Sequence, residues 1–340
     1  FDVTSTGLPT VSVTATEADN DTQSLVVSST SPSVTEGATN TFTVKLAFQP
    51  ASDVTVNVAR ASGDTDLSVS GGATLTFTSA NWNTAQTVTL AAAEDVDLTN
   101  GSAVFDVTST GLPTVSITAT EADNDTQSLV VSSTSLSVTE GATNTFTVKL
   151  AFHPASDVTV NVARASDDTD LAVSGGATLT FTAANWNTAQ TVTLAAAEDV
   201  DLTNGSAVFD VTSTGLPTVS VTGTEADNDT QSLVVSSTSL SVAEGATNTF
   251  TVKLAFQPAA DVTVNVGRAS GDTDLSVSGG ATLTFTTANW NTAQTVTLAA
   301  AEDVDLANGS AVFDVTSTGL PTVSVTGTEA DNDTQSLVVS

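Results

Sequence analysis

The chain has 340 residues, with 38 Asp or Glu, 6 Lys or Arg and a single His, so its formal net charge at pH 7 is −32. A charge of this size repels nucleic acids and anionic membranes and makes cations the expected partners. The absence of Cys excludes disulfides and thiolate metal sites, and one His cannot serve several repeated units, so only oxygen atoms remain as metal ligands.

The rest of the composition indicates a folded protein that does not insert into membranes. Hydrophobic residues make up 39% of the chain, which is too large a share for a disordered acidic tail. No apolar run approaches the roughly 20 residues that a membrane-spanning helix needs.

The chain is internally repeated. The segment FDVTSTGLPTVS begins at Phe1, Phe105, Phe209 and Phe313, a spacing of 104 residues. We place the joints after the acidic, turn-rich segment EADNDTQ, just before a strand-like SLVVSS. This predicts a C-terminal stub of a preceding repeat at residues 1–23, full repeats at residues 24–127, 128–231 and 232–335, and the first strand of a following repeat at residues 336–340. We expect an excerpt of a longer array, with polymerisation through residues 1–23 as the less favoured alternative.

The first two full repeats are nearly identical. They differ at seven positions, namely Pro32/Leu136, Gln49/His153, Gly63/Asp167, Ser68/Ala172, Ser79/Ala183, Ile117/Val221 and Ala119/Gly223. Copies this similar are expected to share one function. Long arrays of one unit typically set reach, stiffness or valency.

Short runs of alternating apolar and polar residues predict the strands of the first full repeat. They cover residues 24–29, 39–48, 53–62, 73–78, 86–93, 102–110 and 114–120, and turns rich in Gly, Pro and Asn separate them. No helical period occurs. The pattern predicts an all-β chain of tandem Ig-like antiparallel β-sandwich domains arranged end to end, with a barrel as the less favoured alternative.

The sequence allows specific predictions for three side chains. Trp82 lies in a turn between two strands and is expected to cap one end of the core. Lys45 alternates with buried positions and should face solvent, which disfavours a Lys-Asn isopeptide bond. His153 replaces Gln49 and Gln257 at the same position of the other repeats, so we predict an exposed turn residue.

The strand directions place most acidic residues at one end of the repeat. If residues 24–29 run toward an upper pole, each later predicted strand reverses direction in turn. Nine of the eleven acidic residues then lie at the upper pole, and only Asp53 and Asp106 do not. This clustering requires that residues 67–70 form no further crossing strand, and we expect residues 63–72 to lie at the top.

Nine carboxylates at one pole repel one another unless hard cations lie between them. Ca²⁺ takes about 6 to 8 oxygen ligands and fits such a set best. Asp123 and Asp125 are two residues apart in an extended segment, so their side chains can point the same way. The alternative is that the acidic loops only keep the surface solvated. The candidate Ca²⁺ ligands are Glu36, Asp64, Asp66, Glu94, Asp95, Asp97, Glu121, Asp123 and Asp125, then Glu140, Asp168, Asp170, Glu198, Asp199, Asp201, Glu225, Asp227 and Asp229, and finally Glu244, Asp272, Asp274, Glu302, Asp303, Asp305, Glu329, Asp331 and Asp333.

Four motifs together resemble the Calx-beta module: V-T-E-G at residues 34–37, T-L-T-F at 74–77, Q-T-V-T-L-A-A-A-E-D at 86–95, and the terminal T-E-A-D-N-D. The resemblance implies Ca²⁺ bound by Glu36, Asp64 or Asp66, Asp95 or Asp97, and Asp123 with Asp125. The near-identical copies are also similar to the extender repeats of giant bacterial RTX-type adhesins, in which Ca²⁺ rigidifies a long stalk.

The favoured function is therefore a non-enzymatic, calcium-stabilised extender region of a long bacterial cell-surface adhesin, located outside the cell and projecting a distal binding tip. Its expected partners are calcium ions and neighbouring repeats of the same chain, with no nucleic acid, no direct membrane insertion and possible lateral self-association. The main alternative is a repeat subunit of an extracellular filament or sheath that assembles through lateral or end-to-end contacts.

Two further function classes are less favoured. Trp82 or the acidic loops could bind a carbohydrate or another ligand, but repetition without diversification argues against selective binding. The pair Asp95 and Asp97 could imitate the carboxylates of a glycosidase, but nothing in the sequence indicates a cleft.

Overall fold

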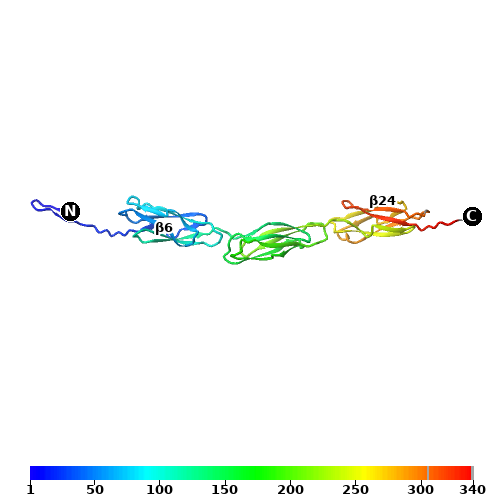
Figure 1. Ribbon diagram of the computed structural model, residues 1–340, viewed down its shortest axis with the longest axis horizontal. Helices are drawn as coiled ribbons and strands as arrows, with labels where there is room; N and C mark the ends of the chain where they lie inside the picture. Colours follow the sequence, from blue (N-terminus) through cyan, green and yellow to red (C-terminus); the bar gives the residue numbers. More distant parts are fainter. Residues whose placement is uncertain (305, 338–340) are drawn as a thin grey trace. The chain divides into compact units, whose positions relative to one another are not determined.

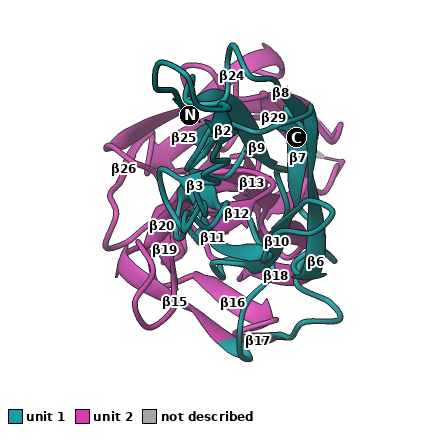
Figure 2. Cartoon of the chain, turned by 90° about the vertical axis from the view of Figure 1, so that its left-hand side faces the viewer, with its two compact units in different colours: residues 1–128, 150–158, 181–188 teal, residues 129–149, 159–180, 189–340 magenta. Residues whose placement is uncertain are grey.

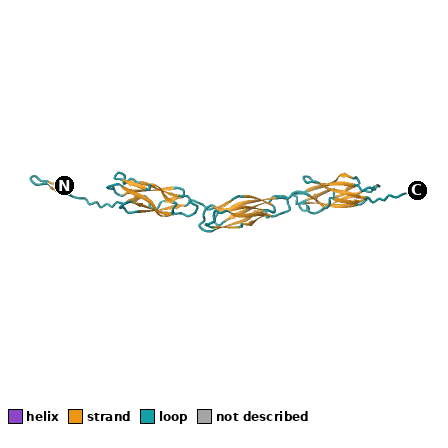
Figure 3. Cartoon of the chain, in the orientation of Figure 1, coloured by secondary structure: helices purple, strands orange, loops and turns teal. Residues whose placement is uncertain are grey.

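The computed structural model describes residues 1–304 and 306–337, and every regular element in this part of the chain is a β-strand (Figure 3). The described residues contain no helix that is long and apolar enough to cross a bilayer. The chain divides into two compact units (Figure 2): unit 1 comprises residues 1–128, 150–158 and 181–188, and unit 2 comprises residues 129–149, 159–180 and 189–340. The predicted ligand Asp305 and part of the predicted strand 336–340 lie outside the described residues.

Unit 1 begins with a short hairpin, in which β1 (Asp2–Val3) pairs antiparallel with β2 (Val11–Ser12). The first full repeat then forms two sheets. The four-stranded sheet has the order β3 (Leu25–Val27), β5 (Thr39–Leu46), β9 (Gln86–Ala92) and β7 (Leu67–Gly71). The five-stranded sheet has the order β4 (Ser33–Thr35), β11 (Val115–Ala122), β10 (Ser102–Thr108), β6 (Val54–Gly63) and β8 (Thr74–Phe77).

The second repeat has the same two sheets, and they belong to unit 2 except for residues 150–158 and 181–188. Its four-stranded sheet has the order β12 (Leu129–Val131), β14 (Thr143–Leu150), β18 (Gln190–Ala196) and β16 (Leu171–Gly175). Its five-stranded sheet has the order β13 (Ser135–Thr139), β20 (Val219–Ala226), β19 (Ser206–Thr212), β15 (Val158–Asp167) and β17 (Thr178–Phe181).

The third repeat lies entirely in unit 2 and repeats the pattern. Its four-stranded sheet has the order β21 (Leu233–Val235), β23 (Thr247–Leu254), β27 (Gln294–Ala300) and β25 (Leu275–Gly279). Its five-stranded sheet has the order β22 (Ser239–Ala243), β29 (Val323–Ala330), β28 (Ser310–Thr316), β24 (Val262–Gly271) and β26 (Thr282–Phe285).

The strand order is that of an immunoglobulin-type sandwich. In the first repeat β3, β5, β9 and β7 take the places of strands A, B, E and D, and β11, β10 and β6 take those of G, F and C. Neighbouring strands are antiparallel except for β4, which pairs parallel with β11. The predicted fold class, an all-β chain of tandem Ig-like sandwiches, is confirmed.

The two sheets of the first repeat pack face to face, in the region labelled β6 in Figure 1, and the apolar side chains between them form one core. Strand β5 buries Phe42, Val44 and Leu46 and exposes Lys45, as the alternation predicted. Complete burial of side chains such as these contributes roughly 1.5 to 3 kcal/mol each. Trp82 lies between β8 and β9 and packs, partly buried, against the edge of this core.

The segment that passes from the four-stranded sheet to the five-stranded sheet contradicts one prediction about residues 63–72. Residues 67–71 are a strand, β7, and do not all lie at the top of the repeat as predicted. Both β7 and β5 pair antiparallel with β9, so β7 descends, and the chain continues in the same direction into β8 of the other sheet. Since β7 and β8 together make a single crossing, the later strands keep their predicted directions.

Four strands of the first repeat end at the same end of the sandwich. Strand β4 runs parallel to β11, and β6 runs the same way because both β6 and β11 are antiparallel to β10. The turn at residues 35–38 reverses the chain into β5, which is antiparallel to β9. We call this end the acidic pole. Glu121 lies near the end of β11, and the loops after β4, β6, β9 and β11 carry Glu36, Asp64, Asp66, Glu94, Asp95, Asp97, Asp123 and Asp125.

Candidate metal centre

Three Asp-x-Asp pairs shape the loops of the acidic pole. The Oδ1 atom of the first Asp accepts a hydrogen bond from the backbone N–H of the second, at 3.0 Å for Asp66, 2.7 Å for Asp97 and 2.8 Å for Asp125. Such Asx turns are a local preference of the sequence, since Asp bonds readily to the backbone two residues on. Each turn occupies one oxygen of its first carboxylate and leaves the other for a ligand.

Two glutamates of each repeat lie beneath these loops. Among the described residues, the only buried polar or charged side chains are Glu36, Glu121 and their copies Glu140, Glu225, Glu244 and Glu329. Glu36 is 4% exposed and Glu121 is 2% exposed. Burying an ionised carboxylate is costly unless it is paired or coordinates a metal.

The buried glutamates lack protein partners for most of their oxygens. The backbone N–H of Asp95 donates to Oε1 of Glu36. In the described part of the chain, Oε2 of Glu36, both carboxylate oxygens of Glu121 and Oδ2 of Asp125 have no hydrogen-bond partner. The neighbouring Arg60 donates to the backbone carbonyl of Asp64. Among the described residues, the pole therefore holds several buried carboxylate oxygens that receive no hydrogen bond from the protein.

Two groups of three carboxylates bring ligand atoms within 4.8 Å of one another in the first repeat. One group consists of Glu36, Asp95 and Glu121, and the other of Glu36, Asp123 and Asp125. Two oxygens bound to one Ca²⁺ at 2.3 to 2.6 Å lie at most about 5 Å apart, so both groups fit that ion. Both groups contain Glu36, so the two candidate positions share this carboxylate.

The mutual repulsion of these groups is visible in their pKa values. Burial, together with the charges of Asp64 and Asp95, raises the pKa of Glu121 from 4.5 to about 7. Desolvation and the charge of Glu36 also raise the pKa of Asp125. Hydrogen bonds from Thr99 lower the pKa of Asp97, which belongs to neither group.

The second repeat reproduces both groups, and the described residues of the third repeat form one group that combines members of both. The corresponding groups are Glu140 with Asp199 and Glu225, Glu140 with Asp227 and Asp229, and Glu244 with Asp303 and Asp333. Burial raises the pKa of Glu225 to about 7 and raises that of Glu329. Oδ2 of Asp168 is a further buried oxygen that has no hydrogen-bond partner among the described residues.

Other predicted ligands lie at the pole but outside these groups. In the first repeat they are Asp64, Asp66, Glu94 and Asp97. Asp64 lies beside Glu121, because a Cβ atom on Gly101 would meet Oδ2 of Asp64 at 1.7 Å and Oε2 of Glu121 at 2.7 Å. Of the copies, Asp168, Asp170, Glu198, Asp201, Asp272, Asp274, Glu302, Glu329 and Asp331 are likewise outside the groups found among the described residues.

Neutral residues also position the loops of the acidic pole. Oδ1 of Asn100 accepts the backbone N–H of Asp123 at 2.8 Å, and Nδ2 of Asn124 donates to the carbonyl of Glu36 at 3.1 Å. Gly37 leaves room for Glu94, whose Oε1 would lie 1.9 Å from a Cβ atom there. The Asn-Gly pair before a strand is a turn signal, and only the folded arrangement shows that it lies against the carboxylates.

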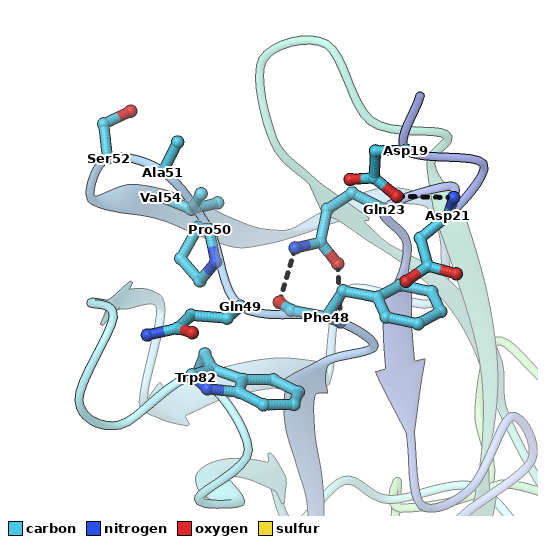
Figure 4. A pocket seen from close by; sticks show the side chains of 10 residues that line it. All are labelled: Asp19, Asp21, Gln23, Phe48, Gln49, Pro50, Ala51, Ser52, Val54 and Trp82. Atoms are coloured by element: carbon cyan, nitrogen blue, oxygen red, sulfur yellow. Dashed lines mark hydrogen bonds between the residues drawn. The ribbon is translucent and has the colours of Figure 1, made fainter. Parts of the chain in front are cut away.

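An open cavity of about 600 Å³ lies away from the acidic pole, at the end of the first repeat that carries Trp82 (Figure 4). Asp19 and Asp21 line one side of it and Trp82 lies on another. Nε2 of Gln23 donates to the carbonyl of Phe48 at 2.6 Å, and Oε1 of Gln23 accepts the N–H of Phe48 at 3.1 Å. Gln23 thereby ties the segment before β3 to the end of β5.

The expectation for His153 was wrong. The residue is half-buried, and its ring packs edge-to-face on Trp186 with 6.3 Å between the ring centroids. In the other repeats, Gln49 and Gln257 instead donate from Nε2 to the carbonyls of Ser79 and Thr287, at 3.0 and 2.9 Å. In all three repeats, the side chain at this position therefore contacts a neighbouring residue of the same repeat.

Comparison with known proteins gives only distant similarities to solved structures. No protein-family model matches the chain, and no curated protein matches it. Similar solved structures include an I-band fragment of titin (8% identity, covering 91% of this chain and 99% of the other, TM-score 0.29). They also include extracellular cadherin domains 3–6 of protocadherin gamma B2 (14%, 92% and 76%, 0.34) and the Escherichia coli adhesin FdeC (12%, 94% and 100%, 0.27).

Proposed function

We propose that each repeat binds Ca²⁺ at its acidic pole and that the chain is a non-enzymatic extender region of an extracellular, bacterial cell-surface adhesin. The repeats at residues 24–127, 128–231 and 232–335 are its building units, and neighbouring repeats and calcium ions are its partners. The observation that carries the proposal is the pair of buried glutamates in every repeat. Among the described residues of the first and second repeats, both glutamates keep carboxylate oxygens without a protein partner, and these glutamates lie close to the carboxylates of nearby Asp side chains.

Burying these carboxylates close to one another costs free energy. A protein gains nothing by burying two carboxylates per repeat beside further carboxylates unless a cation neutralises them. Oxygen is the only ligand type present, which suits a hard cation, and the irregular loops suit the flexible coordination of Ca²⁺ better than the strict octahedron of Mg²⁺. A bound ion would join the loops after β4, β9 and β11 and so stiffen the end of each repeat.

Thermal unfolding of the whole chain in Ca²⁺, Mg²⁺ and EDTA tests the metal. An ion that binds only the folded state stabilises it by about 2.7 kcal/mol per site at 100 times the dissociation constant. We expect Ca²⁺ to raise the midpoint well above its value in EDTA, and Mg²⁺ to raise it less. An unfolding midpoint that is the same in Ca²⁺ and in EDTA would contradict the proposal.

A matched pair of variants separates site binding from charge screening. Changing Glu121, Glu225 and Glu329 to Gln removes three charges from the poles. Changing the exposed Asp53, Asp157 and Asp261 to Asn removes the same charge elsewhere. We expect the Glu variant to lose much of the response to Ca²⁺ and the Asp variant to keep it. Equal responses would mean that Ca²⁺ only screens the net charge.

A second candidate, a filament or sheath subunit that associates laterally, is favoured by one surface. The strands of the four-stranded sheets contain no Asp or Glu in any repeat, although the chain carries 38 such residues. A shallow groove of about 260 Å³ lies there between Val26, Thr43, Lys45, Asn83 and Ala85. Copies can approach through such a face without repulsion between like charges.

Sedimentation of the chain over a range of concentrations in Ca²⁺ tests this candidate. Association that disappears when Lys45, Lys149 and Lys253 are changed to Glu would support the filament. A monomer at all concentrations would leave the extender as the only candidate.

A further inference from the structure

The loop before the F-type strand of each repeat contains the same dipeptide. Asn100-Gly101, Asn204-Gly205 and Asn308-Gly309 stand directly before β10, β19 and β28. All three Asn side chains are exposed and lie outside the strands. These are the Asn-Gly pairs of the chain, and every other Asn is followed by Thr, Val, Trp or Asp.

The acidic pole accounts for the Gly of this pair. A Cβ atom would meet Oδ2 of the neighbouring Asp at 1.7 Å on Gly101, 1.6 Å on Gly205 and 1.8 Å on Gly309. The carboxylate of the second buried Glu lies 2.7 to 2.9 Å from the same point. Two carboxylates therefore close over a position that only Gly can fill.

The same pole accounts for the Asn. Its Oδ1 atom accepts the backbone N–H of the Asp that follows the last strand, at 2.8 Å for Asn100, 2.9 Å for Asn204 and 2.8 Å for Asn308. This bond fixes the loop that carries Asp123 and its copies. The requirements of the pole thus place Asn directly before Gly in an exposed loop of every repeat.

We propose that Asn100, Asn204 and Asn308 are sites of spontaneous deamidation. The main-chain nitrogen of Gly101 loses its proton and bonds to Cγ of Asn100, the Cγ–Nδ2 bond breaks, and ammonia leaves a cyclic imide. Water then opens either C–N bond of the imide and yields Asp or isoaspartate, without any oxidant or reductant. Gly favours the attack because no Cβ atom shields its nitrogen and its backbone turns freely, and Asn is a known labile residue.

The product changes the charge of the pole. An Asp at position 100 can still accept the N–H of Asp123, so the loop keeps its bond while the pole gains a carboxylate. An isoaspartate inserts an additional methylene into the backbone and breaks this geometry. The effect of the new charge on calcium binding rests on the proposed function, whereas the modification itself does not.

Peptide mapping by mass spectrometry of the whole chain, incubated at mildly alkaline pH in EDTA, tests the modification. The controls are Asn83, Asn187 and Asn291, which are also exposed but precede Thr. A synthetic peptide with the sequence Leu-Thr-Asn-Gly-Ser-Ala shows the rate without the fold. We expect conversion at the three Asn-Gly sites and none at the controls. Unmodified Asn-Gly sites when the peptide has fully converted, or conversion no faster than at the controls, overturns the proposal.

A separate experiment measures how the charge added by deamidation affects stability. Changing Asn100, Asn204 and Asn308 to Asp imitates the product, and changing Asn83, Asn187 and Asn291 to Asp adds the same charge away from the pole. We expect the first variant to have the lower unfolding midpoint in EDTA and to recover in Ca²⁺. Equal midpoints in EDTA contradict the consequence, and a first variant that is lower in EDTA without recovery in Ca²⁺ contradicts the proposed calcium site instead.

Discussion

Glu36 and Glu121 are both buried at the acidic pole, but their surroundings differ. Glu36 accepts the backbone N–H of Asp95, so part of its charge is compensated by the protein. Neither oxygen of Glu121 has a partner in the described residues, and burial with the charges of Asp64 and Asp95 raises its pKa to about 7. The negative charge of Glu121 is therefore the one that most needs neutralisation, either by a proton or by a metal ion.

The stability of the metal-free chain should depend on pH through Glu121 and its copies. The folded pKa of about 7 lies above the unfolded value of 4.5, so the folded state holds more protons between these values. Unfolding free energy therefore falls as the pH rises from about 4.5 through about 7, by on the order of 3 kcal/mol per fully buried Glu, and levels off above. Thermal unfolding in EDTA at pH 5 and pH 8 measures this difference.

Calcium should reverse this dependence, because the ion binds the deprotonated carboxylates and its stabilisation grows as protons leave. The rise in midpoint on adding Ca²⁺ is expected to be larger at pH 8 than at pH 5. A midpoint in EDTA that increases between pH 5 and pH 8 would contradict the assignment of Glu121 as the destabilising group.

The single substitution Glu121→Gln should act in opposite directions with and without the ion. The neutral amide removes the charge penalty, so at pH 8 in EDTA we expect a gain in the stability of the first repeat on the order of 1 to 3 kcal/mol. In Ca²⁺ the variant lacks a ligand and gains less from the ion. Differential scanning calorimetry in both conditions measures the two effects, with Asp53→Asn as the control. A loss of stability in EDTA would contradict the argument.

At the scale of the strands, the change of sheet between β7 and β8 depends on a glycine. Gly72 has a φ of 73°, and a Cβ atom there would lie 2.3 Å from the carbonyl oxygen of Thr87. The neighbour is backbone and cannot move aside cheaply. We expect Gly72→Ala to destabilise the first repeat by about 3 kcal/mol or more, measured by thermal unfolding.

The third repeat offers a matched control for this prediction. Gly267 has nothing within 4 Å of its missing Cβ, and the same position is Ala59 and Ala163 in the other repeats. We expect Gly267→Ala to leave the stability unchanged or to raise it by up to about 1 kcal/mol, because it restricts only the unfolded chain. Equal losses in both variants would show that the sheet change does not depend on Gly72.

The strands with clear alternation could be predicted from the sequence, and two short ones could not. Strand β5 was predictable because Phe42, Val44 and Leu46 mark a single buried face. Strand β4 has three residues, too few to show a period. Strand β7 was interpreted as a loop because the segment is short and breaks at Gly71 and Gly72. The glycines mark a change of sheet, which depends on partner strands that are distant in sequence.

The acidic pole was predictable in outline, because strand direction alone brings the loop carboxylates to one end. The burial of Glu36 and Glu121 was not, since an acidic residue after a strand normally faces solvent. The roles of Asn100 and Gly101 also required the fold, because Asp64 follows β6, whereas Glu121 and Asp123 lie at and just after the end of β11. Pairing across long sequence distances determines the interior of the site.

At the scale of the whole chain, the repeats are nearly identical, so each of them has carboxylates at its acidic pole that repel one another. The net charge of −32 is concentrated at the acidic poles, where solvent screens buried carboxylates least. Each repeat has its own core and its own pole, so the binding of ions and the cost of their removal should add up over the repeats. Stability would then scale with calcium occupancy, repeat by repeat.

This additivity can be tested by disabling one repeat. Because only the pole of the second repeat is altered, changing Glu140 and Glu225 to Gln should lower the number of bound calcium ions by one third while the other two repeats bind as before. In Ca²⁺, calorimetry should then resolve an earlier transition for the altered repeat and a later one for the rest, since the cores are separate. A matched variant with Asp157→Asn and Asp210→Asn, which lie away from the pole, should keep full binding and one transition. If the altered pole abolished calcium binding in all repeats, the repeats would be a single cooperative system, and the stepwise extender would have to be replaced by an assembly that gains or loses its ions as a whole.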